Sequence, residues 1–178
     1  GLFEVEYMEL YNSSDRILDL AYVKIVDGKT MLSFPSYLLF PKEYVIVTAA
    51  SNVAKFQSYG KVVGVLGYFS LLNQGELLQL VNATHQEVYS VAYTVDWYRD
   101  AEKQDGGWSL EMIDVRYPCV GQMNWKASEN KLGGTPGVVN SVSSEIIVIP
   151  SDFVTASGVI VTAFVLNSRE APPSAATF

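Results

Sequence analysis

The hydrophobic pattern at the start of the chain is that of a strand with one solvent-facing side. Within residues 3–7, Phe, Val and Tyr alternate with two glutamates, which is the period-2 spacing of a half-buried strand. Met8 and Leu10 then continue with the opposite parity. We therefore expect either that both faces of this strand are covered or that a bulge shifts its register.

Short apolar or alternating segments recur along most of the chain, separated by turn residues. Asp27-Gly28 is a strong hairpin signal between two of them. Residues 51–58 favour one short helix, residues 94–107 form a polar, acidic loop, and residues 114–144 carry no regular pattern. The further strand candidates are residues 17–26, 31–34, 43–49, 61–66, 76–81, 86–93, 108–113, 145–149 and 158–166.

Short strands with turn signals every ~8–12 residues are typical of a β-sandwich or barrel. Strands and helices do not alternate in this chain, so a doubly wound parallel sheet is not expected. The pattern therefore predicts an all-β fold with one short helix. The 11 Tyr and 8 Phe residues agree with this prediction, because aromatic side chains suit pleated, half-buried surfaces.

The character of the sequence changes after residue 144. Two Val/Ile-rich strand candidates follow, and residues 171–177 are rich in Pro, Ala and Ser, as linkers and chain ends are. We divide the chain into a domain over residues 1–144 and an additional part over 145–178. That part either completes the first sheet or begins a following domain. The abrupt, strand-like start indicates a piece of a longer protein.

Charge and cysteine content narrow the classes of partner and site. The formal net charge is −7, whereas proteins that grip phosphates carry a Lys/Arg surplus, so nucleic acid is not expected as a partner. No run approaches the ~20 apolar residues of a membrane span. Cys119 is the single cysteine. It excludes an internal disulfide and leaves either a buried thiol or one that pairs with another chain or domain.

Several motifs occur in an order that resembles the lamin tail domain. The last three of them are the most specific part of the match, which spans about residues 3–142. The motifs are residues 7–12 (YMELYN), 41–47 (PKEYVIV), 72–80 (LNQGELLQL), 105–111 (DGGWSLE), 124–128 (NWKAS) and 133–137 (GGTPG). The chain departs from the family at Tyr22-Val23, where the second strand usually carries Gly-Trp. It also departs at Met112, where an Arg is usual.

The resemblance implies an immunoglobulin-like β-sandwich of antiparallel strands. It further implies a non-catalytic interaction, adhesion or scaffolding module within a larger bacterial protein at the cell surface, in the periplasm or in the secreted fraction. The expected partners are a protein or a glycan, together with the neighbouring domains of the parent chain.

Four residues in these motifs are expected to serve structure. Glu9 shares a strand face with Tyr7 and Tyr11, and a buried carboxylate needs donors, so we predict that it fastens a loop through backbone N–H groups. Trp125 is expected in the core. Gly134 and Pro136 suit a tight loop with positive φ and a fixed proline φ.

The residue types in the chain give little support for a catalytic site. His85 is the only histidine, and it lies in a predicted hairpin turn, which disfavours a Ser-His-Asp arrangement and any site that needs several imidazoles. We therefore expect no enzymatic activity and no cofactor. The alternative is a calcium ion held by Asp96, Asp100 and Asp105, because calcium prefers several oxygen ligands.

The acidic loop supplies the candidate ligand-binding residues. Asp96, Trp97, Tyr98, Asp100 and Trp108 would suit a carbohydrate-binding module, in which exposed rings stack on sugars and carboxylates bind hydroxyl groups. A cation-stabilised accessory domain of a secreted hydrolase or nuclease is the third hypothesis. The sequence leaves all three open.

Overall fold

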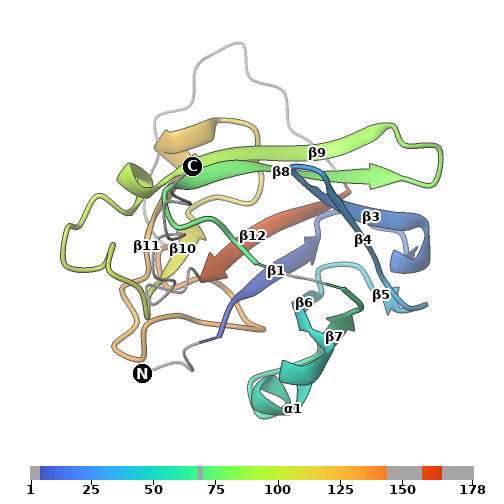
Figure 1. Ribbon diagram of the computed structural model, residues 1–178, viewed down its shortest axis with the longest axis horizontal. Coiled ribbons are helices and arrows are strands. Elements are labelled where there is room, and N and C mark those ends of the chain that lie inside the picture. The colour runs from blue at the N-terminus through green and yellow to red at the C-terminus, as the bar shows by residue number, and fades with distance from the viewer. Residues whose placement is uncertain (1–4, 68–69, 144–157, 166–178) are drawn as a thin grey trace, which may run out of the picture.

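The computed structural model describes residues 5–67, 70–143 and 158–165 (Figure 1). Within these residues, the helical elements are α1 (Val53–Phe56) and four 3-10 turns, η1 (Leu20–Tyr22), η2 (Ala50–Asn52), η3 (Val95–Tyr98) and η4 (Gly121–Asn124). The strands are β1 (Tyr7–Asn12), β2 (Leu18–Asp19), β3 (Val23–Asp27), β4 (Thr30–Ser33), β5 (Leu38–Leu39), β6 (Tyr44–Ala49), β7 (Val62–Val65), β8 (Gly75–Asn82), β9 (Glu87–Thr94), β10 (Ser109–Met112), β11 (Trp125–Ala127) and β12 (Val159–Val165). In the described part of the chain, no helix has the length and apolar character to cross a bilayer.

Two main sheets make up the fold, which confirms the all-β prediction. One has six strands in the order β11-β10-β12-β1-β6-β7, and the other has four in the order β4-β3-β8-β9. A small ribbon pairs β2 with β5. The pairing is antiparallel except between β6 and β7, which are parallel. The chain between these two strands passes through η2 and α1, the kind of crossover that a parallel pair requires.

The main core lies between the two sheets. Met8, Leu10 and Phe164 face it from the six-stranded sheet, and Ile25 and Leu80 face it from the four-stranded sheet. The rings of Tyr93 in β9 and Phe164 in β12 meet across the layers with centroids 4.4 Å apart. The aromatic-rich strands therefore bury one another, as the sequence pattern predicts.

Both faces of β1 are covered, and its register also shifts. Tyr7, Met8, Glu9 and Leu10 are all fully buried, and a bulge interrupts the β1–β12 pairing between Glu9 and Leu10. Tyr7 packs on the outer side of the six-stranded sheet in a second apolar cluster with Ile46 and Phe56. The switch of parity in the sequence thus reflects both of the causes considered.

The strand β12 belongs to the six-stranded sheet. It pairs with β1 on one side and β10 on the other, so Val159–Val165 completes the sheet rather than standing apart from it. The candidate strand 145–149 and the Pro/Ala/Ser-rich stretch 171–177 lie outside the described residues.

Three segments differ from the sequence-based expectation because side-chain contacts override the pattern. Residues 17–26 do not form one strand: the Asp19 carboxylate accepts the Ala21 N–H at 3.0 Å and caps η1. The irregular stretch 114–144 contains η4 and the short strand β11. The acidic loop 94–107 begins with η3, which turns two aromatic side chains inward.

Gly75 offers a test of the β8–β9 packing. It has φ +122°, and a Cβ there would lie 2.3 Å from the Tyr93 carbonyl oxygen. We expect Gly75→Ala to lower the free energy of unfolding by about 2–3 kcal/mol, since both strain and overlap must be relieved. Gly28→Ala is the matched control, because Gly28 also has positive φ but a Cβ there meets nothing within 4 Å, and it should cost only about 1 kcal/mol. Equal losses in urea unfolding would contradict this packing.

Candidate functional site

The aromatic side chains of η3 lie in the core, so the expectation that Trp97 and Tyr98 are exposed for stacking is wrong. They are 8% and 1% exposed. The Trp97 ring packs against Trp125 with centroids 6.2 Å apart, and the Tyr98 hydroxyl donates to the Trp108 carbonyl oxygen at 3.0 Å. Burying these rings clamps the acidic loop to β11, while Asp96 of this turn is exposed.

Trp108 is half-buried, and a cation covers its ring. Lys103 Nζ lies 4.5 Å from the ring centroid, within the range of a cation–π contact. The same ammonium donates to the Ser128 carbonyl oxygen at 2.9 Å. Trp108 therefore holds the loop through Lys103 and does not present that ring face to a ligand.

The predicted calcium ligands do not converge, and that prediction is wrong. Among the residues that the structure describes, no three His, Cys, Asp or Glu side chains gather as a metal site would require. Asp100 instead accepts the Glu102 N–H at 3.1 Å, and its other oxygen lies 3.6 Å from Lys103 Nζ. Asp96 and Asp105 are exposed. The Lys103 ammonium and the Glu102 N–H thus take the place of a metal ion at Asp100.

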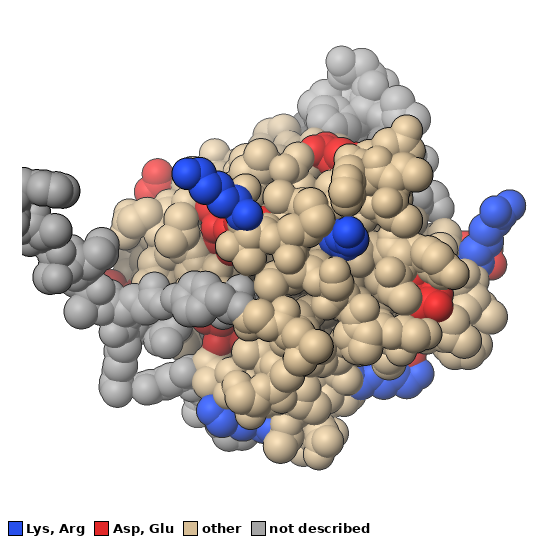
Figure 2. All heavy atoms as spheres, turned by 45° about the vertical axis from the view of Figure 1, so that its right-hand side comes forward, with Lys and Arg blue, Asp and Glu red and all other residues tan. Residues whose placement is uncertain are grey.

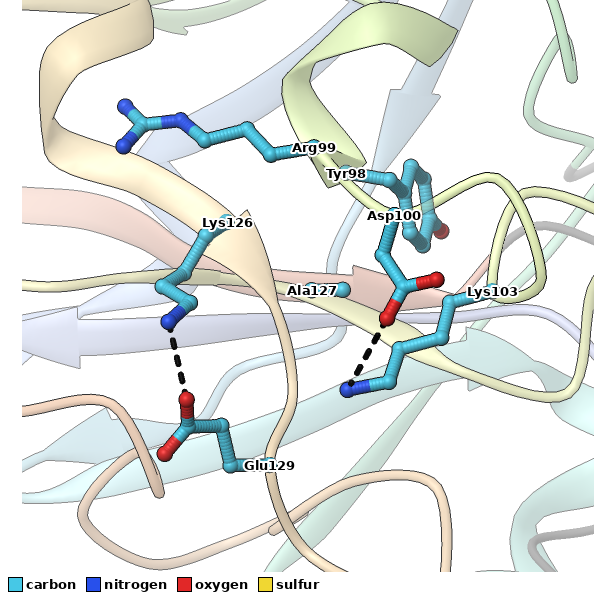
Figure 3. A pocket seen from close by; sticks show the side chains of 7 residues that line it. All are labelled: Tyr98, Arg99, Asp100, Lys103, Lys126, Ala127 and Glu129. Carbon is cyan, nitrogen blue, oxygen red and sulfur yellow. Dashed lines mark hydrogen bonds and ion pairs between the residues drawn. The ribbon is translucent and has the colours of Figure 1, made fainter.

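A recess of about 200 Å³ lies between the end of η3 and β11 (Figure 3). Two ion pairs stand in it, Asp100 with Lys103 and Lys126 with Glu129, whose Nζ–Oε1 distance is 2.8 Å. We call this the charged recess, and its lining residues are Tyr98, Arg99, Asp100, Lys103, Lys126, Ala127 and Glu129.

The sequence-based site and the charged recess overlap only in part. Tyr98 and Asp100 were predicted, whereas Arg99, Lys103, Lys126 and Glu129 were not. Arg99 adopts a left-handed backbone conformation with φ +54° at the end of η3, and its guanidinium donates to the Gln122 carbonyl oxygen at 2.6 Å.

Glu9 fastens the 133–137 loop to β1. It is fully buried, and its two carboxyl oxygens accept the Gly137 N–H at 2.6 Å and the Thr162 hydroxyl at 2.9 Å. Gly137 has φ +81°. Pro136 and Gly134 are buried in the same loop, although the positive φ values fall at Gly133 and Gly137.

Glu111 holds the same loop from β10, and sequence reasoning did not assign it this role. It is fully buried and lies opposite Ala163 of β12, as Glu9 does from the other side. One carboxyl oxygen accepts from the Ser109 and Thr135 hydroxyls, both at 2.9 Å. The other accepts the Ser141 N–H and hydroxyl at 2.9 and 2.7 Å. We call Glu9 and Glu111 the carboxyl pair.

A short relay connects Glu111 to the charged recess. The Ser141 Oγ that donates to Glu111 also accepts the Glu129 N–H at 2.9 Å and lies 3.0 Å from the Ser128 Oγ. The Ser128 carbonyl in turn anchors Lys103. The buried acid therefore fixes the backbone on which the recess is built.

Burial raises the pKa of Glu9 to about 8, against the lowering effect of its hydrogen bonds to Gly137 and Thr162. The nearby charge of Glu111 adds to the rise. Both contributions disfavour the ionised form. The Glu9 carboxyl is therefore held at a pKa near neutrality by its packing.

Trp125 lies in the core, as predicted. It is fully buried, with its ring 5.5 Å from that of Phe164.

His85 is exposed in the β8–β9 turn, where its Nε2 lies 3.4 Å from Lys24 Nζ. Cys119 is exposed, so the expectation of a buried thiol is wrong.

Comparison of the chain with protein-family models, curated proteins and solved structures gives no match. The resemblance to the lamin tail domain therefore stays a prediction that rests on the order of its motifs.

Glu9→Gln tests the raised pKa. A carboxyl whose pKa is higher in the folded protein than in the unfolded chain makes stability fall as pH rises between the two values. The wild type should therefore lose stability from about pH 4.5 to 8, by an amount on the order of a few kcal/mol. Gln mimics the protonated acid, so the difference in unfolding free energy between Glu9→Gln and the wild type should grow in favour of the variant over this range. Glu76, whose pKa is raised to about 7 mainly by burial, is present in both proteins and cancels. A difference in unfolding free energy between the two proteins that does not change with pH would contradict the raised pKa of Glu9.

Glu111→Gln should behave differently. Glu111 accepts four hydrogen bonds, which suits a carboxylate because an amide NH₂ cannot accept. We expect this variant to lose about 1–3 kcal/mol of stability at neutral pH, measured by urea unfolding. A loss no greater than that of Glu9→Gln at the same pH would argue against the distinct roles of the carboxyl pair.

Proposed function

We propose that this domain is a non-catalytic interaction module of a larger cell-surface, periplasmic or secreted protein, and that the charged recess is its contact site. One observation carries the proposal: the buried carboxyl groups are engaged by the domain's own loops, whereas the charges of the recess lie at the surface. The Glu129 side chain is 54% exposed, and that of Lys126 is 22% exposed. Groups so placed suit recognition of a partner.

The engagement of the carboxyl pair argues against a hydrolytic role for these acids. General acid–base catalysis needs a group within hydrogen-bond reach of the substrate. Glu9 and Glu111 are fully buried and covered by the 133–141 segment that they bind. Asp100 forms an ion pair with Lys103.

The distribution of charge supports a partner other than nucleic acid. On the face shown in Figure 2, Lys and Arg side chains stand singly among acidic and uncharged residues, unlike the continuous basic stripe of a nucleic-acid-binding surface. A carbohydrate-binding role has less support than the sequence alone suggested, because Trp97 and Tyr98 are buried and Lys103 covers a face of Trp108.

Site-specific photo-crosslinking in the parent protein tests this proposal. A benzophenone side chain replaces Glu102, an exposed residue of the loop that forms one side of the recess, or, as a control, the exposed Lys29 in the β3–β4 turn, which does not line the recess. We expect a discrete cross-linked product from position 102 and none from position 29. Equal labelling at both positions would count against the recess as a contact site. Turnover of esters, glycosides or phosphodiesters that Asp100→Asn abolishes would overturn the non-catalytic assignment.

A further inference from the structure

The charged recess carries more positive than negative groups, although the chain as a whole is acidic. Arg99, Lys103 and Lys126 line the recess together with Asp100 and Glu129, whereas the formal net charge of the chain is −7. A local reversal of sign marks a place where an anionic group is favoured over the surrounding surface.

The three cationic side chains differ in how firmly contacts within the fold hold them. Lys103 is bound by the Ser128 carbonyl, Asp100 and the Trp108 ring, so it is a fixed positive charge. Arg99 is exposed, and its guanidinium carries five N–H groups, of which Nη2 donates to Gln122. An exposed guanidinium can therefore still offer a bidentate fork to a carboxylate.

Glu129 shows how a carboxylate fits against Lys126. Its Oε1 lies 2.8 Å from Lys126 Nζ, and the hydrogen bond from Lys126, followed by the charges of Lys126 and Lys103, lowers the pKa of Glu129. Exposed ion pairs contribute little to stability. A carboxylate from a partner would therefore compete with the Glu129 side chain for Lys126.

The size and lining of the recess narrow the ligand class. A volume of about 200 Å³ is below the ~300–1,000 Å³ of sites that enclose a whole small molecule, so the recess suits a single side chain. Sugar acids commonly need a ring to stack on, but Tyr98 is buried and Lys103 covers a face of Trp108.

We infer that the charged recess binds the carboxylate of an Asp or Glu side chain on a protein partner, in the place that Glu129 takes beside Lys126, with Lys103 and Arg99 adding positive charge to the recess. This inference rests on the proposed function and names the chemistry that the contact site recognises.

A titration of the ¹⁵N-labelled protein followed by NMR tests it, with a blocked Gly-Ser-Glu-Ser-Gly peptide as the probe. We expect saturable shifts at the amides of the recess, and binding roughly tenfold weaker for the matched peptide with Gln in place of Glu. Free glucuronate is the third probe and should bind more weakly than the Glu peptide.

Substitutions in the recess should change binding of the Glu peptide in opposite directions. The double variant Arg99→Gln/Lys126→Gln should lose the saturable response, while Lys29→Gln, at an exposed residue that does not line the recess, should keep it. Glu129→Gln removes the internal competitor and should tighten binding of the Glu peptide by roughly two- to fivefold. A gain of binding cannot arise from misfolding, so this variant protects the test against a merely disruptive substitution.

Three results would overturn the inference: no saturable shift with the Glu peptide, equal affinity for the Gln peptide, or tighter binding of glucuronate. Each leaves the proposed function standing if position 102 still cross-links to a partner. Failure of the cross-link with the peptide preference intact would instead remove the proposed function and keep the anion site.

Discussion

The burial of two carboxyl groups that accept hydrogen bonds from neutral donors is the constraint on which the outer layer of this domain depends. A buried acid must find hydrogen-bond donors, and Glu9 and Glu111 find them in the segment between Gly137 and Ser141. The two acids flank the same residue of β12, Ala163. The segment is therefore held over the sheet from two strands at once.

The buried carboxyl groups affect the candidate site through hydrogen bonds that fix the backbone, rather than through their charge. Ser141 binds Glu111 with its N–H and hydroxyl and accepts the Glu129 N–H. Lys103, anchored on the Ser128 carbonyl, closes the other side. The fold thus uses buried polar groups to position a loop and leaves ion pairs, which contribute little to stability when exposed, at the surface of the recess.

The sequence predicted the sheets better than the site, for identifiable reasons. Glu9 could be assigned because strand alternation puts it beside Tyr7 and Tyr11, where a carboxylate needs loop donors. The inward turn of Trp97 and Tyr98 carries no periodic signal, since a four-residue 3-10 turn is too short to show one. Lys126 and Glu129 lie around β11, a three-residue strand in a stretch without regular pattern, so nothing local indicated that they meet the loop after η3.

Amide hydrogen exchange at Gly137 and Ser141 tests the central claim most directly, because these two N–H groups donate to the carboxyl pair. Protection comparable to that of the β1 amides is the predicted result, since opening either bond exposes a buried acid. Exchange of both amides at the rate of an unstructured loop would show that Glu9 and Glu111 do not hold this segment, and the account would fail.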